Sequence, residues 1–160
     1  MKRIAFIILI ILVSTNLLNA QKKSNVMFFE IGGPGLASFN YDRRFTNSDD
    51  GFGARIGVGG IGSTNSESIG VITFPIGLNY LATGDHKNYF ELGINQTFLS
   101  ANSNIFNSNN TITTSFTTLN FGYRLQPIKN GFVFKAAVNP IIVDGTFFPF
   151  YFGIGFGYKF

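Results

Sequence analysis

Histidine and cysteine, two residue types that often carry catalysis and metal binding, are nearly missing from this sequence. The chain has one histidine, His86, and no cysteine. A histidine-dependent acylase or deacylase needs a serine or an acidic partner beside the imidazole, but the serines gather in segments that we expect at the opposite end of the molecule. Asp85-His86-Lys87 is better explained as a turn. We therefore predict no catalytic residue, no metal site and no cofactor, and hence not an enzyme.

A glycine-rich run offers a second candidate for chemistry. Residues 57–62 read Gly-Val-Gly-Gly-Ile-Gly and match the glycine spacing of dinucleotide-binding loops. Such a loop needs a helix directly after it, because the helix N-terminus binds the phosphate. Residues 63–68 are Ser-Thr-Asn-Ser-Glu-Ser, and a strand-like segment follows. We interpret the inward glycines as residues that reduce crowding of side chains in the interior that the sheet encloses. Gly60 and Gly62 are expected to begin a loop.

Charged residues are few, and several share the polar side of strand-like segments. In an antiparallel hairpin, two residues equidistant from the centre of the connection face each other. Asp42 and Arg55 are equidistant from the centre of segment 46–51, and Glu91 and Arg124 are nearly so from that of segment 101–113. We expect both pairs to meet. The predicted inward network, with a structural role, comprises Glu30, Asp42, Arg44, Arg55, Glu91, Arg124 and Lys135.

Polar and apolar residues alternate along the chain after residue 24, and no apolar stripe of helical spacing appears. Near the C-terminus, for example, Ile154 and Phe156 alternate with Gly153, Gly155 and Gly157. A period of two is typical of strands with two different faces. The sequence predicts strands at 26–32, 36–45, 52–60, 69–82, 89–100, 114–126, 131–140 and 149–160.

The predicted connections alternate in length. Segments 46–51, 83–88 and 127–130 are short, whereas 61–68, 101–113 and 141–148 are longer. The first connection, at Gly33-Pro34-Gly35, is tight. An even number of strands joined in this way is typical of transmembrane β-barrels.

Side-chain volume indicates which face is inside. One face of the predicted strands is dense in Phe and Ile, and the other is mostly Gly, Asn, Thr and Ser. A closed barrel of eight strands has room only for side chains, so rows of Phe and Ile fit poorly inside and belong in lipid. Backbone groups in lipid must be paired, and the sheet must therefore close. We predict an all-β fold, a closed eight-stranded antiparallel up-and-down transmembrane β-barrel.

Aromatic residues gather near the strand ends that flank the short connections. This distribution predicts a girdle at one membrane–water interface. The predicted girdle comprises Tyr41, Phe45, Phe52, Tyr80, Tyr89, Phe90, Tyr123, Phe132, Tyr158 and Phe160.

The N-terminus has the pattern of a secretory signal peptide. Lys2 and Arg3 precede an uncharged stretch over 4–13 and a more polar stretch that ends in Ala20. We expect residues 1–20 to be the signal and residues 21–160 to be one barrel domain. The formal charge of +4 includes the two basic residues of the signal, and no basic cluster points to nucleic acid. Charged residues make up 12% and aromatic residues 16%, which excludes a disordered chain.

Several motifs resemble those of small eight-stranded outer-membrane proteins of Gram-negative bacteria. Residues 30–33 read Glu-Ile-Gly-Gly, residues 40–45 read Asn-Tyr-Asp-Arg-Arg-Phe, and residues 122–124 read Gly-Tyr-Arg. These resemble a largely uncharacterised set of short outer-membrane barrels. The last strand ends on Phe160 and looks like the C-terminal signal that the barrel-assembly machinery recognises. The resemblance implies an exported protein of the outer membrane with outer-membrane lipid as its surroundings, and it implies no activity.

Four functions remain open on the sequence. The leading hypothesis is a structural or surface-interaction protein whose lumen is filled and whose outer loops contact an external partner. The alternatives are a lipid-modifying enzyme, a small narrow channel gated by the inward charges, and a soluble lipocalin-like periplasmic barrel.

Overall fold

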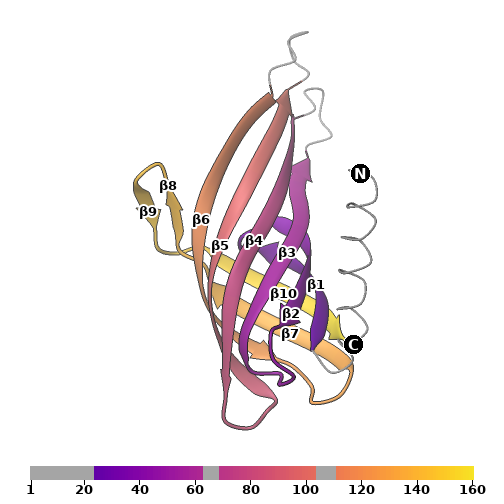
Figure 1. Ribbon diagram of the computed structural model, residues 1–160. Coiled ribbons are helices and arrows are strands. Elements are labelled where there is room, and N and C mark those ends of the chain that lie inside the picture. The colour runs from indigo at the N-terminus through magenta and orange to yellow at the C-terminus, as the bar shows by residue number, and fades with distance from the viewer. Residues whose placement is uncertain (1–23, 63–68, 104–110) are drawn as a thin grey trace, which may run out of the picture.

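The structure, a computed structural model, describes residues 24–62, 69–103 and 111–160 and arranges them mostly as strands (Figure 1). The signal peptide predicted over residues 1–20 lies outside the described residues, as do most of segment 61–68 and the centre of segment 101–113. The strands are β1 (Asn25–Gly32), β2 (Ala37–Arg44), β3 (Gly51–Gly62), β4 (Ile69–Thr83), β5 (Asn88–Ser103), β6 (Thr111–Leu125), β7 (Gly131–Val138), β8 (Ile141–Val143), β9 (Thr146–Phe148) and β10 (Phe152–Lys159).

Eight of these strands form a closed antiparallel barrel. Each of β1 to β6 pairs with the next strand along the chain, and β10 pairs with both β7 and β1 to close the ring. The predicted fold class is confirmed, and the barrel strands start and end within three residues of their predicted bounds. Within the described ranges, no helix is long and apolar enough to span a membrane.

The two faces of the barrel wall differ as the alternation predicts. Outward side chains such as Phe39, Ile56 and Phe121 are exposed, whereas inward Asn40 and Asn120 are buried. The apolar face therefore surrounds the barrel, and glycines and polar side chains fill its interior.

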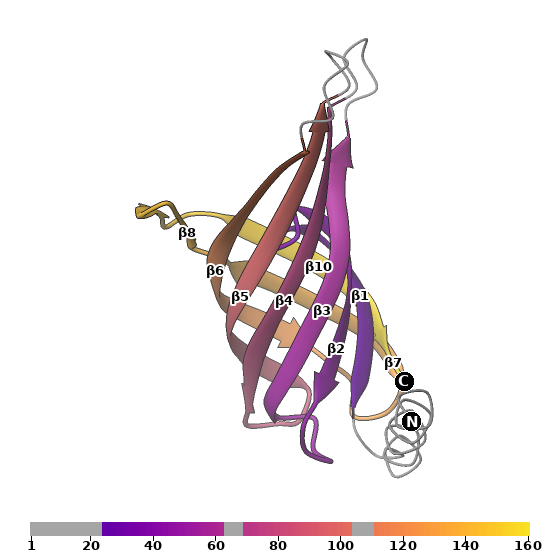
Figure 2. The ribbon, with the colours of Figure 1, turned by 45° about the horizontal axis from the view of Figure 1, so that its top comes forward.

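The wall is not equally high on all sides. Strands β3 to β6 have 12, 15, 16 and 15 residues, whereas β1, β2, β7 and β10 have eight each. Figures 1 and 2 show β3 to β6 rising together beyond the rest of the ring. This four-stranded extension lies at the end of the barrel where the longer connections were predicted.

The prediction that residues 141–148 form a long connection is wrong, because this segment is a hairpin of β8 and β9. Strands β7 and β8 both pair with β6, and they do so in the same register. Asn139-Pro140 interrupts the pairing between them. Asp144 and Gly145 both have positive φ, of 47° and 77°, as in the two-residue turn that suits the twist of a hairpin. The hairpin leans away from the barrel wall (Figures 1 and 2).

Two smaller expectations also need correction. Strand β3 continues to Gly62, so Gly60 lies within a strand rather than at the start of a loop. Tyr89 does not join the aromatic girdle. Its side chain points into the barrel and is 1% exposed, because it shares the inward side of β5 with Glu91.

Candidate functional site

The interior of the barrel holds all seven charged residues that the sequence predicted to point inward. They come from six strands, and none is more than 3% exposed. The side chains are Glu30 on β1, Asp42 and Arg44 on β2, Arg55 on β3, Glu91 on β5, Arg124 on β6 and Lys135 on β7. Isolated buried charges are very unfavourable, so their mutual arrangement decides whether the barrel can contain them.

Six ion pairs join these residues into one chain in which cations and anions alternate. We call it the lumen chain. Every carboxylate lies between two cations, and an arginine stands at each end. The lumen chain runs in the order Arg55, Glu30, Lys135, Glu91, Arg124, Asp42, Arg44.

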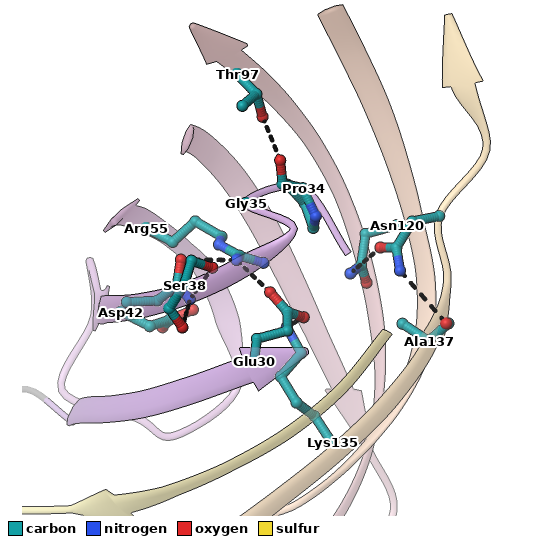
Figure 3. A network of polar contacts seen from close by, with 12 residues as sticks. Glu30, Pro34, Gly35, Ser38, Asp42, Arg55, Thr97, Asn120, Lys135 and Ala137 are labelled. Atoms are coloured by element: carbon teal, nitrogen blue, oxygen red, sulfur yellow. Dashed lines mark hydrogen bonds and ion pairs between the residues drawn. The ribbon is translucent and has the colours of Figure 1, made fainter. Parts of the chain in front are cut away.

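The first half of the lumen chain surrounds Glu30. Its Oε2 lies 2.5 Å from Nη2 of Arg55, and its Oε1 lies 3.5 Å from Nζ of Lys135. Figure 3 shows the Glu30 carboxylate approached by Arg55 on one side, with Lys135 extending toward it from the other. Lys135 also lies 3.0 Å from Oε1 of Glu91, so one ammonium group bridges β1 and β5.

The second half surrounds Arg124. Its Nε donates to Oε2 of Glu91 at 2.8 Å, and its Nη2 donates to Oδ2 of Asp42 at 3.0 Å. Asp42 accepts from Arg44 at 2.5 Å through its other oxygen. Asn79 of β4 completes this end, because its amide donates to Asp42 and its oxygen accepts from Arg44.

Phe28 lies among the cations of the lumen chain. Its ring centre is 4.8 Å from Nζ of Lys135, 5.2 Å from the guanidinium carbon of Arg55 and 5.9 Å from that of Arg124. The negative faces of an aromatic ring attract cations at these distances. Phe28 thus occupies the space between three cations without adding another charge.

The two predicted pairs have different outcomes. Asp42 and Arg55 are opposite each other in the backbone, as the hairpin arithmetic predicts, but the ion pairs of Arg55 and Asp42 go to other residues. Glu91 and Arg124 do form an ion pair, although Glu91 lies opposite Gly122. Their side chains reach diagonally across two positions, which agrees with the nearly opposite placement that the sequence predicted.

Glycines on neighbouring strands provide room for the long side chains. A Cβ atom at Gly53 would lie 2.2 Å from Nη2 of Arg44, and one at Gly155 would lie 2.8 Å from Cγ of Lys135. Carbon atoms do not approach side-chain atoms so closely. Each of these glycines is therefore part of the space that a charged neighbour occupies.

The turn between β1 and β2 closes the lumen on the side of the four-stranded extension. Gly33, Pro34 and Gly35 are buried, and two threonines from the far wall donate hydrogen bonds to this turn. Thr97 Oγ1 donates to the carbonyl oxygen of Pro34 at 2.7 Å, and Thr73 Oγ1 donates to that of Gly35 at 2.7 Å. Figure 3 shows Pro34 reaching toward Thr97.

Lys159 ties together the opposite end of the barrel. Its ammonium lies 2.6 Å from Oδ2 of Asp49 and donates to the carbonyl oxygens of Pro127 and Ile128 at 2.9 and 2.8 Å. The last strand is thereby joined to two of the short connections.

Sequence reasoning missed several parts of this interior. Thr73, Thr97 and Asn79 share the inward parity of their strands, but nothing in their spacing shows that they reach across the barrel. Phe28 lies two residues before Glu30 on β1 and therefore shares its inward face. This spacing could have predicted that the Phe28 ring lies beside the charged residues.

The two other motifs that the sequence offered, His86 and residues 57–62, lie in a turn and in a strand. His86 is exposed, with φ of 56°, in the turn between β4 and β5. The backbone N–H groups of Asn88 and Lys87 donate to Asp85 in this turn and hold its pKa below the ordinary range. Residues 57–62 lie within β3, and no group of three potential metal-ligating side chains occurs in the part of the chain that the structure describes.

Comparison with known proteins identifies relatives in structure and none in sequence. No protein-family model and no curated protein sequence matches the chain. The outer membrane protein Ail of Yersinia pestis, in a phospholipid bilayer nanodisc, is similar with a TM-score of 0.54 at 15% identity, over 86% of this chain and 98% of Ail. The N-terminal β-barrel domain of OprF from Pseudomonas aeruginosa is similar with a TM-score of 0.55 at 11% identity, over 87% of this chain and 98% of that domain.

At such low identity the similarity concerns the fold. The chain has the fold of small outer-membrane β-barrels, which agrees with the resemblance that its motifs indicated. In this structure the side chains of the lumen chain and the inward turn lie buried inside the barrel.

Proposed function

We propose that the protein is an outer-membrane barrel with a structural and surface-interaction role and a permanently filled lumen. It is exported, cleaved after Ala20 and inserted so that the short connections and the C-terminus face the periplasm. The last strand, β10, with Phe160 after it, is the element that the barrel-assembly machinery recognises.

The outward side chains support the membrane location. Residues such as Phe52, Phe74, Ile94, Phe132 and Phe156 are between 48% and 62% exposed. Apolar side chains around the whole circumference would be very unfavourable in water, and hydrocarbon is their suitable solvent. This distribution disfavours a soluble lipocalin-like barrel, whose apolar side chains would point inward.

The four-stranded extension is the observation that carries the surface-interaction role. Strands β3 to β6 continue beyond the shorter strands and carry the connections at 63–68 and 104–110. A surface raised above the membrane on a rigid sheet is well placed to meet an external partner. The filled lumen disfavours the alternative of an open channel.

Single cysteines provide a test, because the chain contains none. Thr114→Cys places a thiol on the exposed upper part of β6, and Ser48→Cys places one in the exposed β2–β3 connection. On intact cells we expect a bulky, membrane-impermeant maleimide to label position 114 and not position 48. Labelling of position 48 alone would reverse the proposed orientation.

The same variants test the contact role. We expect cells that produce the protein to aggregate or attach to surfaces more than cells without it. The bulky label on Thr114→Cys should remove this difference, whereas treatment of Ser48→Cys cells should not. Equal attachment of producing and non-producing cells would contradict the surface-interaction role and leave the structural one.

A further inference from the structure

The hairpin of β8 and β9 is an apolar projection from the barrel wall. Ile142, Phe147, Phe148 and Phe150 are 39%, 56%, 52% and 81% exposed. Asp144, at the turn, is the one charged residue among residues 141–150. A two-stranded hairpin is marginally stable in water, and this one would also expose its aromatic side chains there.

The base of the hairpin lies where the outer face of β6 changes character. Below the junction with β8, the outward residues Leu119, Phe121 and Tyr123 are apolar; above it, Thr117 and Ser115 are polar. Such a change from apolar to polar marks the edge of the hydrocarbon layer. The hairpin therefore leaves the wall at the point where the outward face of β6 changes from apolar to polar.

The apolar surface of the hairpin is continuous with the barrel wall. Phe150 continues the outward row that Phe152, Ile154 and Phe156 form on β10. Ile142 lies opposite Thr117 and has the outward parity of β6, and Phe147 lies opposite Ile142 on the same face. When a strand bends away from the barrel axis, its outward face turns toward the membrane.

We propose that the β8–β9 hairpin is a lateral membrane anchor that lies in the interfacial region of the outer leaflet, with Ile142 and Phe147 directed into lipid. This inference rests on the proposed membrane location and adds a lipid contact outside the barrel wall. The aromatic side chains suit the boundary between headgroups and hydrocarbon, and Asp144-Gly145 at the tip remains near the headgroups. The bend at Pro140 and Pro149 sets the hairpin at an angle to the wall.

Tryptophan fluorescence tests this proposal, because the chain contains no tryptophan. Three full-length variants are refolded into phosphatidylcholine vesicles: Phe147→Trp in the hairpin, Phe156→Trp on the barrel wall and Ser48→Trp in the exposed β2–β3 connection. Each is measured with lipids brominated near the headgroup, with lipids brominated deep in the acyl chain, and with acrylamide in the water.

We expect brominated lipid to quench the tryptophan at 147 and acrylamide to quench it little. Shallow bromines should quench it more than deep ones, and the wall variant should show the reverse preference. The variant at Ser48 should respond mainly to acrylamide. A further variant, Phe148→Trp on the opposite face of the hairpin, should be quenched less by lipid than Phe147→Trp.

Two outcomes would overturn the anchor. If position 147 responds to acrylamide as position 48 does while the wall variant is quenched by lipid, the hairpin stands in water and only this inference fails. Stronger lipid quenching at 148 than at 147 would overturn the assigned direction of the faces. If the wall variant also escapes lipid quenching, the proposed membrane location fails as well.

Discussion

At the scale of single residues, the lumen chain is a set of charges that can be buried only together. Each carboxylate has two cationic neighbours, so removal of one group leaves uncompensated charge in a confined interior. Loss of one partner of a fully buried ion pair costs about 3–5 kcal/mol. The lumen chain thus allows the barrel to close around these charged residues, but it adds little net stability to the fold.

Glu30 and Arg55 should be strongly coupled. We expect Glu30→Gln and Arg55→Gln each to lower the free energy of unfolding, and the double variant to lose less than the sum of the two. The coupling should be about 0.5–3 kcal/mol, as for residues in direct contact. Urea unfolding from lipid vesicles measures it.

The pair of Asp42 and Arg55 is the matched control. These residues face each other in the backbone but have no ion pair with each other. Asp42→Asn with Arg55→Gln should therefore show weaker coupling than Glu30→Gln with Arg55→Gln. Stronger coupling of the control pair would mean that backbone register decides the contacts and that the lumen chain is ordered differently.

Charge on the lipid face should be damaging for a different reason. Phe121→Arg and Ile94→Arg each place a guanidinium in hydrocarbon, and we expect each to destabilise the barrel by about 2–4 kcal/mol near the midplane. Asn120→Ser, on the inward face, loses the hydrogen bond to Asn139 and should cost about 1 kcal/mol. Unfolding in vesicles that shows harmless arginines and a severe Asn120→Ser would reverse the two faces.

The sequence predicted which charges lie inside but only part of their pairing. Parity assigns the side of the wall, since successive side chains of a strand point to opposite faces. Hairpin arithmetic finds opposite residues on neighbouring strands, and it found Asp42 and Arg55. It cannot find the pair of Arg124 and Asp42, because β6 and β2 are not neighbours and meet only across the closed lumen.

At the scale of elements, the β1–β2 turn acts as a cap that two hydrogen bonds hold in the barrel. Thr97→Val and Thr73→Val keep the side-chain shape and remove the donors to Pro34 and Gly35. We expect each change to cost about 1–3 kcal/mol, because a buried carbonyl loses its partner. Hydrogen exchange at the amides of Gly33 and Leu36 should become faster.

Thr118→Val is the control for both variants. Thr118 is buried and inward like Thr73 and Thr97, but its hydroxyl has no hydrogen-bond partner among the described residues. This change should leave exchange in the turn unaltered and stability nearly so. Equal effects of all three substitutions would show that the cap does not depend on these two hydrogen bonds.

The predicted strands succeeded where alternation was long and failed where a short hairpin interrupted it. The eight barrel strands carry clear alternation, whereas residues 141–148 were assigned to a connection. The sequence did contain a signal there, since Val143-Asp144-Gly145-Thr146 has the Asp-Gly turn typical of hairpins. Strands of three residues are too short for alternation to reveal them.

At the scale of the whole molecule, a closed ring with a filled lumen predicts two properties together. The folded barrel should migrate faster than the heated chain in gels, and in planar bilayers it should give no steady conductance. We expect the lumen chain and the capped turn to block the path that ions would take through the barrel. Conductance of the unaltered protein would contradict the filled lumen, and conductance that appears only in Glu91→Gln would make the lumen chain a gate.

The inner face of β10 has a consequence for the order of assembly. Gly153, Gly155 and Gly157 point inward, and the side chains of Lys135 and Phe28 lie over the last two. The lumen chain takes none of its members from β10, so it can form among strands synthesised earlier. At these three positions β10 itself brings no side chain into the lumen, so we expect β1 and β10 to pair last without rearranging the lumen chain.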